Sequence, residues 1–299
     1  MAAQETKEEE EVERIFKRYR EQYFKSQPTD VLLITLPKSG TTWLKALIFS
    51  IVNRTRYDNS NHPLLTQSPH VCVPFLDVDL FCATPVPAIE NMPSPRLFAC
   101  HIPYTSLPES IISSGCRIVY ICRNPKDVFT SLWHFSCKVR TSINDLPPLS
   151  LDDTFDLFCK GVSPFGPFWD HVLGYWKASL QWPNRVLFLN YEEMKKEHLV
   201  HVNRLADFLD HPFSLEEDKE GVVQEIIRLC SFENLRNLEV NKTGRTLIGG
   251  ANQNSVVIEN SVFFREGKVG DSENLLTAQM NDLLDQIMKE KLDDSHFSF

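Results

Sequence analysis

The chain has 299 residues, of which 42% are hydrophobic, and a formal net charge of −9 at pH 7. This length and apolar content suffice for a sizeable core, and α/β folds of this size often remain undivided, so we expect a single domain. The acidic balance disfavours a protein that binds nucleic acid through a general basic field. Any anionic ligand must therefore be held locally.

The cysteine pattern and the N-terminal stretch narrow the class of protein. Eight cysteines are scattered without CxxC pairs or regular histidine spacing, so neither a disulfide framework nor a metal site is indicated. The N-terminus is charged from residue 5 onward and lacks the apolar centre of a signal peptide. No later stretch approaches the roughly 18 apolar residues of a membrane span. We expect a cytoplasmic protein with no membrane partner.

The first predicted element is an exposed amphipathic helix over residues 5–24, where Ile15, Tyr19 and Tyr23 recur at helical spacing among charges. Residues 1–29 are accordingly interpreted as a helical lead-in, and residues 30–299 as the main domain.

The stretch DVLLIT, residues 30–35, predicts a short buried strand, and LPKSGTTW follows it directly. A strand, a glycine turn and a helix that starts at Thr41 or Thr42 leave backbone N–H groups aimed at one spot, which favours an anion. A nucleotide triphosphatase loop reads GxxxxGK[ST], with its lysine after the last glycine. Here Lys38 precedes Gly40, so the chain does not match that loop.

Two further strand–helix units follow. CRIVYIC, residues 116–122, precedes a helix predicted to start near Pro125, and RVLFLNYEEM, residues 185–194, also runs from strand to helix. Repetition of this unit predicts an α/β fold with a central, mainly parallel sheet flanked by helices. The aromatic stretch over residues 161–176 either lines an apolar pocket or belongs to the core.

Several of these segments carry a family resemblance when taken together. PKSGTTWLKAL, CRNPKDVFTSLWHF, NYEEMKKE, CSFENLRNLEVNK and FFREGKVGD, in this order, closely resemble the cytosolic sulfotransferase family, particularly its plant members, from Asp30 onward. The resemblance implies a single α/β domain with a P-loop-like phosphosulfate-binding loop. It implies transfer of a sulfuryl group from 3'-phosphoadenosine 5'-phosphosulfate (PAPS) to a hydroxyl of a small, largely apolar metabolite, without a metal.

KSGTTW resembles the family's loop for the 5'-phosphosulfate. The resemblance implies that Lys38 neutralises charge on the bridging oxygen as the sulfuryl group leaves, while the amides of Gly40, Thr41 and Thr42 hold the 5'-phosphate. Trp43 would stack near the adenine. The residues that the resemblance assigns to the donor are Lys38, Ser39, Gly40, Thr41, Thr42, Trp43, Arg123, Ser131, Tyr191, Phe232, Arg265, Glu266 and Gly267.

The 3'-phosphate of the donor needs its own cationic site. Arg123, Ser131 and the segment Arg265 to Gly267 correspond to the family's residues for this group, and they offer a guanidinium fork, a hydroxyl and backbone amides. Tyr191 and Phe232 match positions that contact the adenosine.

The reaction that the resemblance implies also needs a general base to take the proton from the acceptor hydroxyl. LFACHIPY, residues 97–104, resembles the family motif whose histidine takes the proton from the acceptor hydroxyl, which makes His101 the predicted base beside Lys38 as the second catalytic residue. An imidazole titrates close enough to neutrality to accept a proton as the O–S bond forms.

The chain departs from the family pattern at several points. The stretch usually written RKGxxGDW is REGKVGDS here, with Glu266 in place of a lysine and Ser272 in place of a tryptophan, and fewer residues than usual precede the KSGTTW loop. These differences keep open a non-catalytic PAPS-binding or PAP-binding protein descended from the enzyme. The dimer motif of the family is not recognisable, so the oligomeric state stays open.

The acceptor is the least determined part. A flavonoid, a steroid-like alcohol and a hydroxylated fatty-acid hormone all fit a largely apolar site. The segments Val73 to Phe81 and Phe165 to Trp176, together with Trp133, are the candidate pocket walls.

Overall fold

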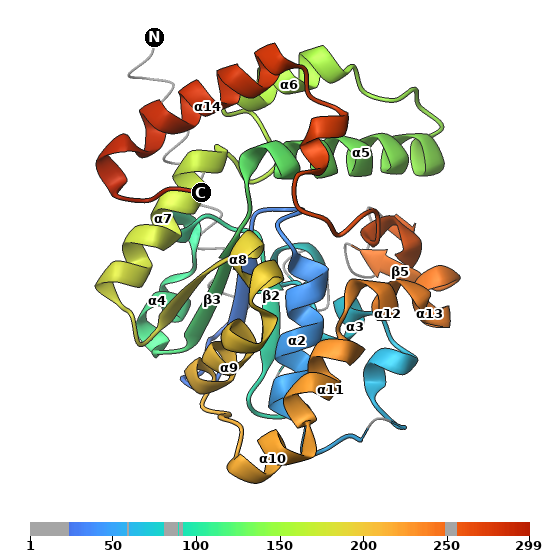
Figure 1. Ribbon diagram of the computed structural model, residues 1–299, viewed down its shortest axis with the longest axis vertical. Helices are drawn as coiled ribbons and strands as arrows, with labels where there is room; N and C mark the ends of the chain where they lie inside the picture. The colour runs from blue at the N-terminus through green and yellow to red at the C-terminus, as the bar shows by residue number, and fades with distance from the viewer. Residues whose placement is uncertain (1–23, 59, 81–88, 90–91, 249–255) are drawn as a thin grey trace.

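The computed structural model of the protein describes residues 24–58, 60–80, 89, 92–248 and 256–299 (Figure 1). The helix predicted over residues 5–24 lies outside this part of the chain except for Phe24. The boundary proposed at residue 29 therefore stays a prediction.

The centre of the fold is a four-stranded sheet in which every neighbouring pair is parallel. Its strand order is β2-β1-β3-β4, formed by Leu97–Cys100, Val31–Thr35, Arg117–Cys122 and Val186–Asn190. Leu33 of β1 pairs with Ala99 on one side and Val119 on the other. All five residues of β1 are buried because helices cover both faces of the sheet. The predicted mainly parallel sheet is confirmed.

Alternate residues of each strand point to opposite faces of the sheet and pack into two separate apolar layers, as the two-residue period of a strand requires. Leu32 and Ile34 belong to one layer, while Val31 and Leu33 belong to the other. Helices on the first face are α4 (Glu109–Ser114), α5 (Pro125–Asn144), α6 (Leu151–Cys159), α7 (Phe168–Gln181) and α14 (Ala278–Leu292). Helices on the second face are α2 (Thr41–Asn53), α8 (Tyr191–Lys196), α9 (His198–Phe208), α11 (Val222–Leu229) and α12 (Phe232–Asn237). In Figure 1, α2, α9 and α11 lie side by side on this second face.

Short elements complete the chain around this framework. They are η1 (Pro63–Leu65), α3 (Pro69–Cys72), the π-helical η2 (Leu76–Leu80), η4 (Tyr104–Ser106), α10 (Leu215–Glu220), α13 (Glu239–Lys242), η5 (Asn260–Phe263), η6 (Asp271–Asn274) and η7 (Asp293–Ser295). Strands β5 (Arg245–Ile248) and β6 (Val256–Glu259) pair antiparallel in a second, small sheet.

The start of α5 agrees with its sequence signals. Asn124 caps the helix because its side-chain oxygen accepts a hydrogen bond from Lys126 N at 3.0 Å, and Pro125 occupies the first helical position. Helix α2 differs, because its N-cap is Gly40, which has no side chain to accept such a bond. The first amides of α2 are therefore left for another partner.

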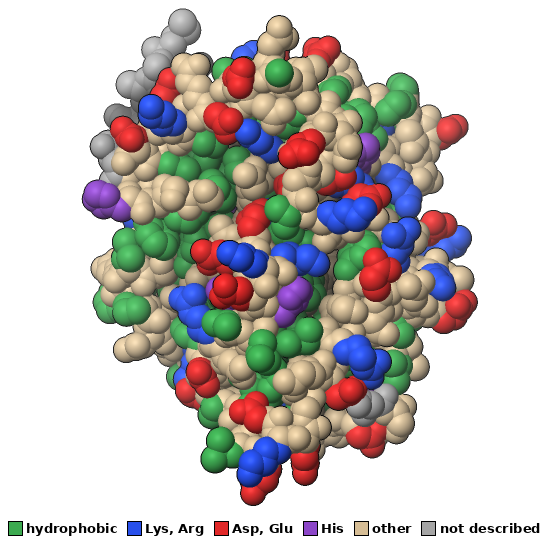
Figure 2. Space-filling view, viewed as in Figure 1, with side chains coloured by type: hydrophobic (Ala, Val, Ile, Leu, Met, Phe, Trp, Pro, Cys, Tyr) green, Lys and Arg blue, Asp and Glu red, His purple; other side chains and the backbone are tan. Residues whose placement is uncertain are grey.

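The surface carries charges of both signs. On the face shown in Figure 2, basic and acidic side chains are interspersed. This distribution agrees with an anionic ligand held by a local site. Within the described ranges, every helix is too short or too polar to cross a lipid bilayer.

Candidate active site

The carboxyl ends of the four parallel strands meet at one edge of the sheet, where ligands of open α/β folds bind. His101 directly follows β2, Arg123 follows β3 and Tyr191 follows β4, while the loop after β1 leads through Lys38 into α2. All four line one cavity of about 420 Å³.

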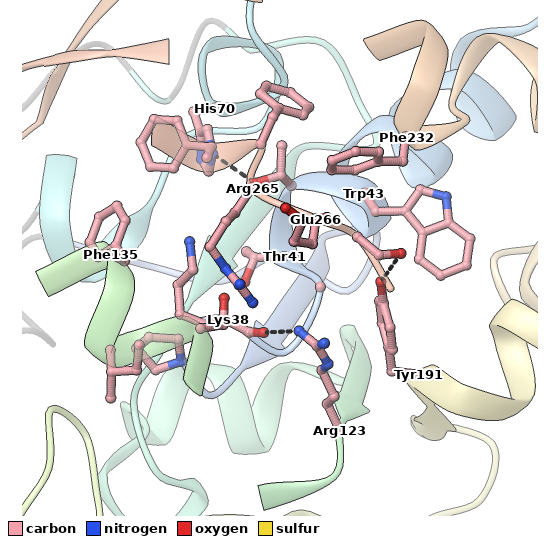
Figure 3. Close-up of a pocket in the computed structure, with 18 of the residues that line it drawn as sticks. Lys38, Thr41, Trp43, His70, Arg123, Phe135, Tyr191, Phe232, Arg265 and Glu266 are labelled. Atoms are coloured by element: carbon pink, nitrogen blue, oxygen red, sulfur yellow. Dashed lines mark hydrogen bonds between the residues drawn. The ribbon is translucent and has the colours of Figure 1, made fainter. Parts of the chain in front are cut away.

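The structure brings together almost the whole set of residues that the sequence resemblance assigns to the site. Those that line the cavity are Lys38, Gly40, Thr41, Thr42, Trp43, His101, Arg123, Ser131, Tyr191, Phe232, Arg265, Glu266 and Gly267. Among them, Figure 3 labels Lys38, Thr41, Trp43, Arg123, Tyr191, Phe232, Arg265 and Glu266. Ser39 is the exception, because its side chain is buried away from the cavity. Its backbone N–H closes the turn by donating to Leu36 O at 3.2 Å.

The loop between β1 and α2 has an unusual backbone at two positions. Lys38 has a φ of 71° and Gly40 a φ of 109°, both in the left-handed region. A Cβ atom at position 40 would also lie 2.9 Å from the Tyr191 ring, so the turn needs glycine there. The first helical N–H that bonds back belongs to Leu44, which donates to Gly40 O at 3.0 Å. The amides of the first turn are thus available to an anion.

Three cationic side chains share one region of the cavity. Figure 3 shows Lys38, Arg123 and Arg265 close to one another. Burial, followed by the positive charges of Arg265 and Arg123, lowers the pKa of Lys38 from 10.5 to about 7. The Lys38 ammonium lies over the Phe135 ring, 4.3 Å from its centroid. Such a concentration of buried positive charge fits an anionic ligand.

Arg123 is held in place by the segment that closes the cavity. Its guanidinium donates to Lys38 O at 3.3 Å, to Lys268 O at 2.7 Å and to Asp127 Oδ2 at 3.1 Å. Asp127 also accepts from Gly270 N at 2.9 Å and from Ser272 N at 3.0 Å. One buried carboxylate therefore connects Arg123 to the backbone of residues 268–272.

Tyr191, Gly267 and Phe232 pack against one another. Tyr191 OH donates to Gly267 O at 3.2 Å, and a Cβ atom at position 267 would collide with the Phe232 ring. Trp43 meets the Tyr191 ring edge-on at 5.6 Å between centroids. These rings form an aromatic surface next to the uncapped start of α2.

Glu266 lies at the rim of the same cavity. Its side chain is 43% exposed, and its carboxylate is 3.5 Å from the ammonium of Lys268. This pairing offsets part of the negative charge that replaces the family's lysine.

His101 has a defined tautomer. Its Nδ1 lies 2.7 Å from the carbonyl oxygen of Thr35, and a carbonyl only accepts, so Nδ1 carries the hydrogen. The Nε2 atom is therefore unprotonated. Burial lowers the pKa of His101 from 6.5 to about 4; the hydrogen bond to Thr35 opposes this shift, and the charges of Lys45 and Lys38 add to it. The imidazole is neutral near pH 7 and has a lone pair available.

The family model described as "Sulfotransferase domain" matches residues 28–296. The chain belongs to the sulfotransferase family. It is 47% identical to "Cytosolic sulfotransferase 5" of Arabidopsis thaliana over 92% of this chain and 83% of the relative. It is 46% identical to "Flavonol 4'-sulfotransferase" of Flaveria chlorifolia over 91% of this chain and 82% of the relative.

Solved structures agree with this assignment. The crystal structure of an Arabidopsis thaliana putative steroid sulphotransferase superposes with a TM-score of 0.70 at 38% identity, covering 95% of this chain and 83% of that one. A mouse sulfotransferase crystallised with PAP shares the fold, with a TM-score of 0.66 at 24% identity over 91% of this chain and 86% of that one. The predicted enzyme class is confirmed: the protein is a sulfotransferase, and its sulfuryl donor is PAPS, as in this family generally.

The candidate walls of the sulfotransferase cavity are only partly as predicted. Phe75 and Val78 line it from the first predicted segment, and Phe165 lines it from the second. The other aromatic side chains of the second segment lie on α7 and do not line the cavity. Trp169 and Tyr175, for example, pack into the core. Trp133 is also outside the cavity, with its Nε1 donating to Leu149 O at 3.2 Å. Phe81 lies outside the described residues.

Sequence reasoning missed several lining residues. Phe135, Lys195 and Phe263 line the cavity and belong to the same motifs that identified the family, so their proximity to predicted site residues was an available signal. His70 also lines it, and nothing in its segment indicates this, because α3 meets α2 only in the folded protein.

Proposed function

We propose that this cavity binds PAPS with its phosphosulfate on residues 38–43 and transfers the sulfuryl group to a hydroxyl of a small, largely apolar acceptor, with His101 as the general base. The observation that carries the proposal is the pairing of His101 Nδ1 with Thr35 O at 2.7 Å, which leaves Nε2 as an acceptor in a cavity that also contains Lys38.

The donor roles follow from charge and position. The first-turn amides of α2 and Lys38 bind the phosphosulfate end, and Lys38 neutralises charge on the oxygen that leaves. Arg123, Ser131 and residues 265–267 bind the 3'-phosphate. Trp43, Tyr191 and Phe232 contact the adenosine.

The reaction is an in-line transfer. The acceptor oxygen forms a bond to sulfur while the bond from sulfur to the 5'-phosphate oxygen breaks, and 3'-phosphoadenosine 5'-phosphate (PAP) leaves. The hydroxyl proton passes to His101 Nε2. Positioning and charge stabilisation supply most of the acceleration, as in phosphoryl transfer.

The acceptor class rests on the rings around His101. The Phe75 ring is 4.9 Å from the imidazole and the Phe165 ring is 5.3 Å from it, between centroids. Such walls suit a small hydroxylated molecule with a flat apolar body. A relative named for a flavonol supports this class, and relatives named as cytosolic support a cytoplasmic location.

The test compares wild type with His101→Ala in two assays, transfer from PAPS to a panel of phenolic and alicyclic alcohols, and calorimetric binding of PAP. Loss of the base lowers kcat by about a hundredfold or more, while the Kd for PAP changes little. His62→Ala is the matched control, because His62 is the buried N-cap of η1 and lies outside the cavity. Retained turnover in His101→Ala would remove His101 from the base role. PAP binding by wild type without turnover of any acceptor would support the non-catalytic alternative.

A further inference from the structure

A second buried imidazole lies in the cavity. His70, at the start of α3, is 6% exposed, and Figure 3 shows it at the opposite end of the cavity from Arg123. Its Nε2 is 3.1 Å from Thr42 Oγ1, and its Nδ1 is 3.3 Å from Lys45 Nζ. The roles proposed above for donor and acceptor binding do not use this histidine.

The orientation of His70 is set by its surroundings. Its ring lies 4.1 Å from the Phe263 ring and 5.5 Å from the Phe75 ring, between centroids. Its backbone N–H donates to Ser68 Oγ at 3.1 Å. Thr42 and Lys45 are three residues apart on α2 and so share one face of that helix, which allows both to reach the same imidazole.

The donor and acceptor roles in the hydrogen bonds among Lys45, His70 and Thr42 can be assigned in only one way. The ammonium of Lys45 only donates, so His70 Nδ1 accepts, and the hydrogen of the neutral ring is on Nε2. Nε2 then donates to Thr42 Oγ1. Within the described part of the chain, His70 is the one hydrogen-bond partner of the Thr42 hydroxyl, which keeps its own hydrogen to donate elsewhere. Burial and the charge of Lys45 lower the pKa of His70 well below 6.5, in agreement with a neutral ring.

We propose that His70 is a positioning residue that occupies a lone pair of the Thr42 hydroxyl and thereby directs its hydrogen to a 5'-phosphate oxygen of the donor nucleotide. The inference rests on the proposed function, because it assumes that the turn between β1 and α2 receives the 5'-phosphate. Lys45 contributes by fixing the tautomer of His70. Each group in this chain donates a hydrogen bond to the next: Lys45 donates to His70, His70 donates to Thr42, and Thr42 donates to the phosphate.

Packing alone does not require this arrangement. A phenylalanine would fill the space between Phe75 and Phe263 without polar atoms, whereas a buried imidazole is costly unless both nitrogens are hydrogen-bonded. A hydroxyl oriented in advance gives a stronger bond to a charged phosphate oxygen than one that must reorient on binding.

The test is a double-mutant cycle read by calorimetry with PAP, adenosine 5'-monophosphate and adenosine 3'-monophosphate. Thr42→Val weakens binding of the two 5'-phosphates by about tenfold, because a charge-assisted hydrogen bond is lost. His70→Phe produces part of this loss, and the double variant binds no more weakly than Thr42→Val alone. Binding of the 3'-monophosphate changes little in all three variants. In kinetics, His70→Phe raises the KM for PAPS more than it lowers kcat.

His70→Gln tests the role of the donor atom, because its amide nitrogen reaches the position of Nε2 and should restore most of the lost affinity. The matched control is His62→Phe, since His62 Nε2 is 3.2 Å from Ser50 Oγ, another hydroxyl of α2, outside the cavity. It leaves the affinity for PAP unchanged. Thermal unfolding of every variant checks that it folds.

Two outcomes overturn the inference while leaving the proposed function intact. In the first, the losses of PAP affinity in the two single variants add up in the double variant. In the second, His70→Phe weakens binding of the 3'-monophosphate as much as binding of the 5'-monophosphate. Failure of wild type to bind PAP at all would instead overturn the proposed function, and the inference with it.

Discussion

At the scale of single residues, Lys38 combines a left-handed backbone with a partly buried side chain whose ammonium faces two other cations. Its φ of 71° places it on the turn after β1. Burial and the charges of Arg265 and Arg123 lower its pKa from 10.5 to about 7, so this side chain loses its proton far more readily than an ordinary lysine. An anion in the cavity favours the protonated form and raises this pKa.

This coupling predicts a pH dependence of binding. Above pH 7 the unliganded Lys38 is increasingly neutral, so binding of PAP requires proton uptake, and affinity falls by up to about tenfold per pH unit between pH 7 and 9. The phosphate groups themselves titrate near pH 6, below this window. Lys38→Arg shows a flatter profile, because a guanidinium stays charged. Calorimetry in two buffers of different ionisation heat measures the proton uptake. An equally steep profile in Lys38→Arg would assign the effect to another group.

At the scale of elements, the cavity depends on how α5 holds the segment that closes it. The first turn of α5 supplies Asp127, which is 2% exposed and bonds to Arg123 and to the amides of Gly270 and Ser272. The contact ties residues 268–272, which directly follow residues 265–267 in the chain, to the ends of the strands. Loss of this carboxylate therefore affects both stability and the 3'-phosphate site.

Asp127→Asn removes the charge and leaves one oxygen for two backbone donors. We expect a loss of about 3 kcal/mol in the free energy of unfolding, because the buried Arg123 charge loses its partner, and a weaker affinity for PAP. Asp285→Asn on α14 is the control, since Asp285 forms an exposed ion pair with Lys126 of α5 at 2.8 Å. It costs about 0.5 kcal/mol or less. Denaturant titration and calorimetry measure the two effects. Wild-type PAP affinity in Asp127→Asn would show that the segment keeps its place without the carboxylate.

At the scale of the whole molecule, the cavity joins segments from distant parts of the chain, from Pro37 to Gly267. A ligand that contacts these segments together stabilises the native state, because the unfolded chain does not assemble the site. At a concentration of one hundred times its Kd, PAP adds about 2.7 kcal/mol to the free energy of unfolding. This raises Tm by about 5 °C. Scanning calorimetry with PAP, and with AMP at the same concentration, measures the shift. An equal shift with AMP would contradict a dedicated site for the 3'-phosphate.

Local patterns in the sequence predicted the elements that carry the chemistry. Continuous apolar runs marked β1, β3 and β4, and Pro125 marked the start of α5, because these signals act within a few residues. Strand β2 was not predicted as a strand, since Leu97–Cys100 is too short to show a period. The aromatic run over residues 161–176 was ambiguous because composition does not tell which face of a helix meets the core. In the fold, α7 turns Trp169 and Tyr175 inward, and Phe165, just before the helix, is the aromatic ring of this run that lines the cavity.

The sequence by itself determined the fold class, the family and the residues expected to bind the donor, because strand and turn signals are local and the motifs are contiguous. Only the tertiary structure decided which side chains meet. The tautomer of His101 depends on Thr35, and the contact of His70 with Thr42 depends on the packing of α3 against α2. The lowered pKa of Lys38 depends on its burial first and then on the charges of Arg265 and Arg123. The physical reason is that burial, protonation and hydrogen-bond direction are set by neighbours in space, which are far apart along the chain.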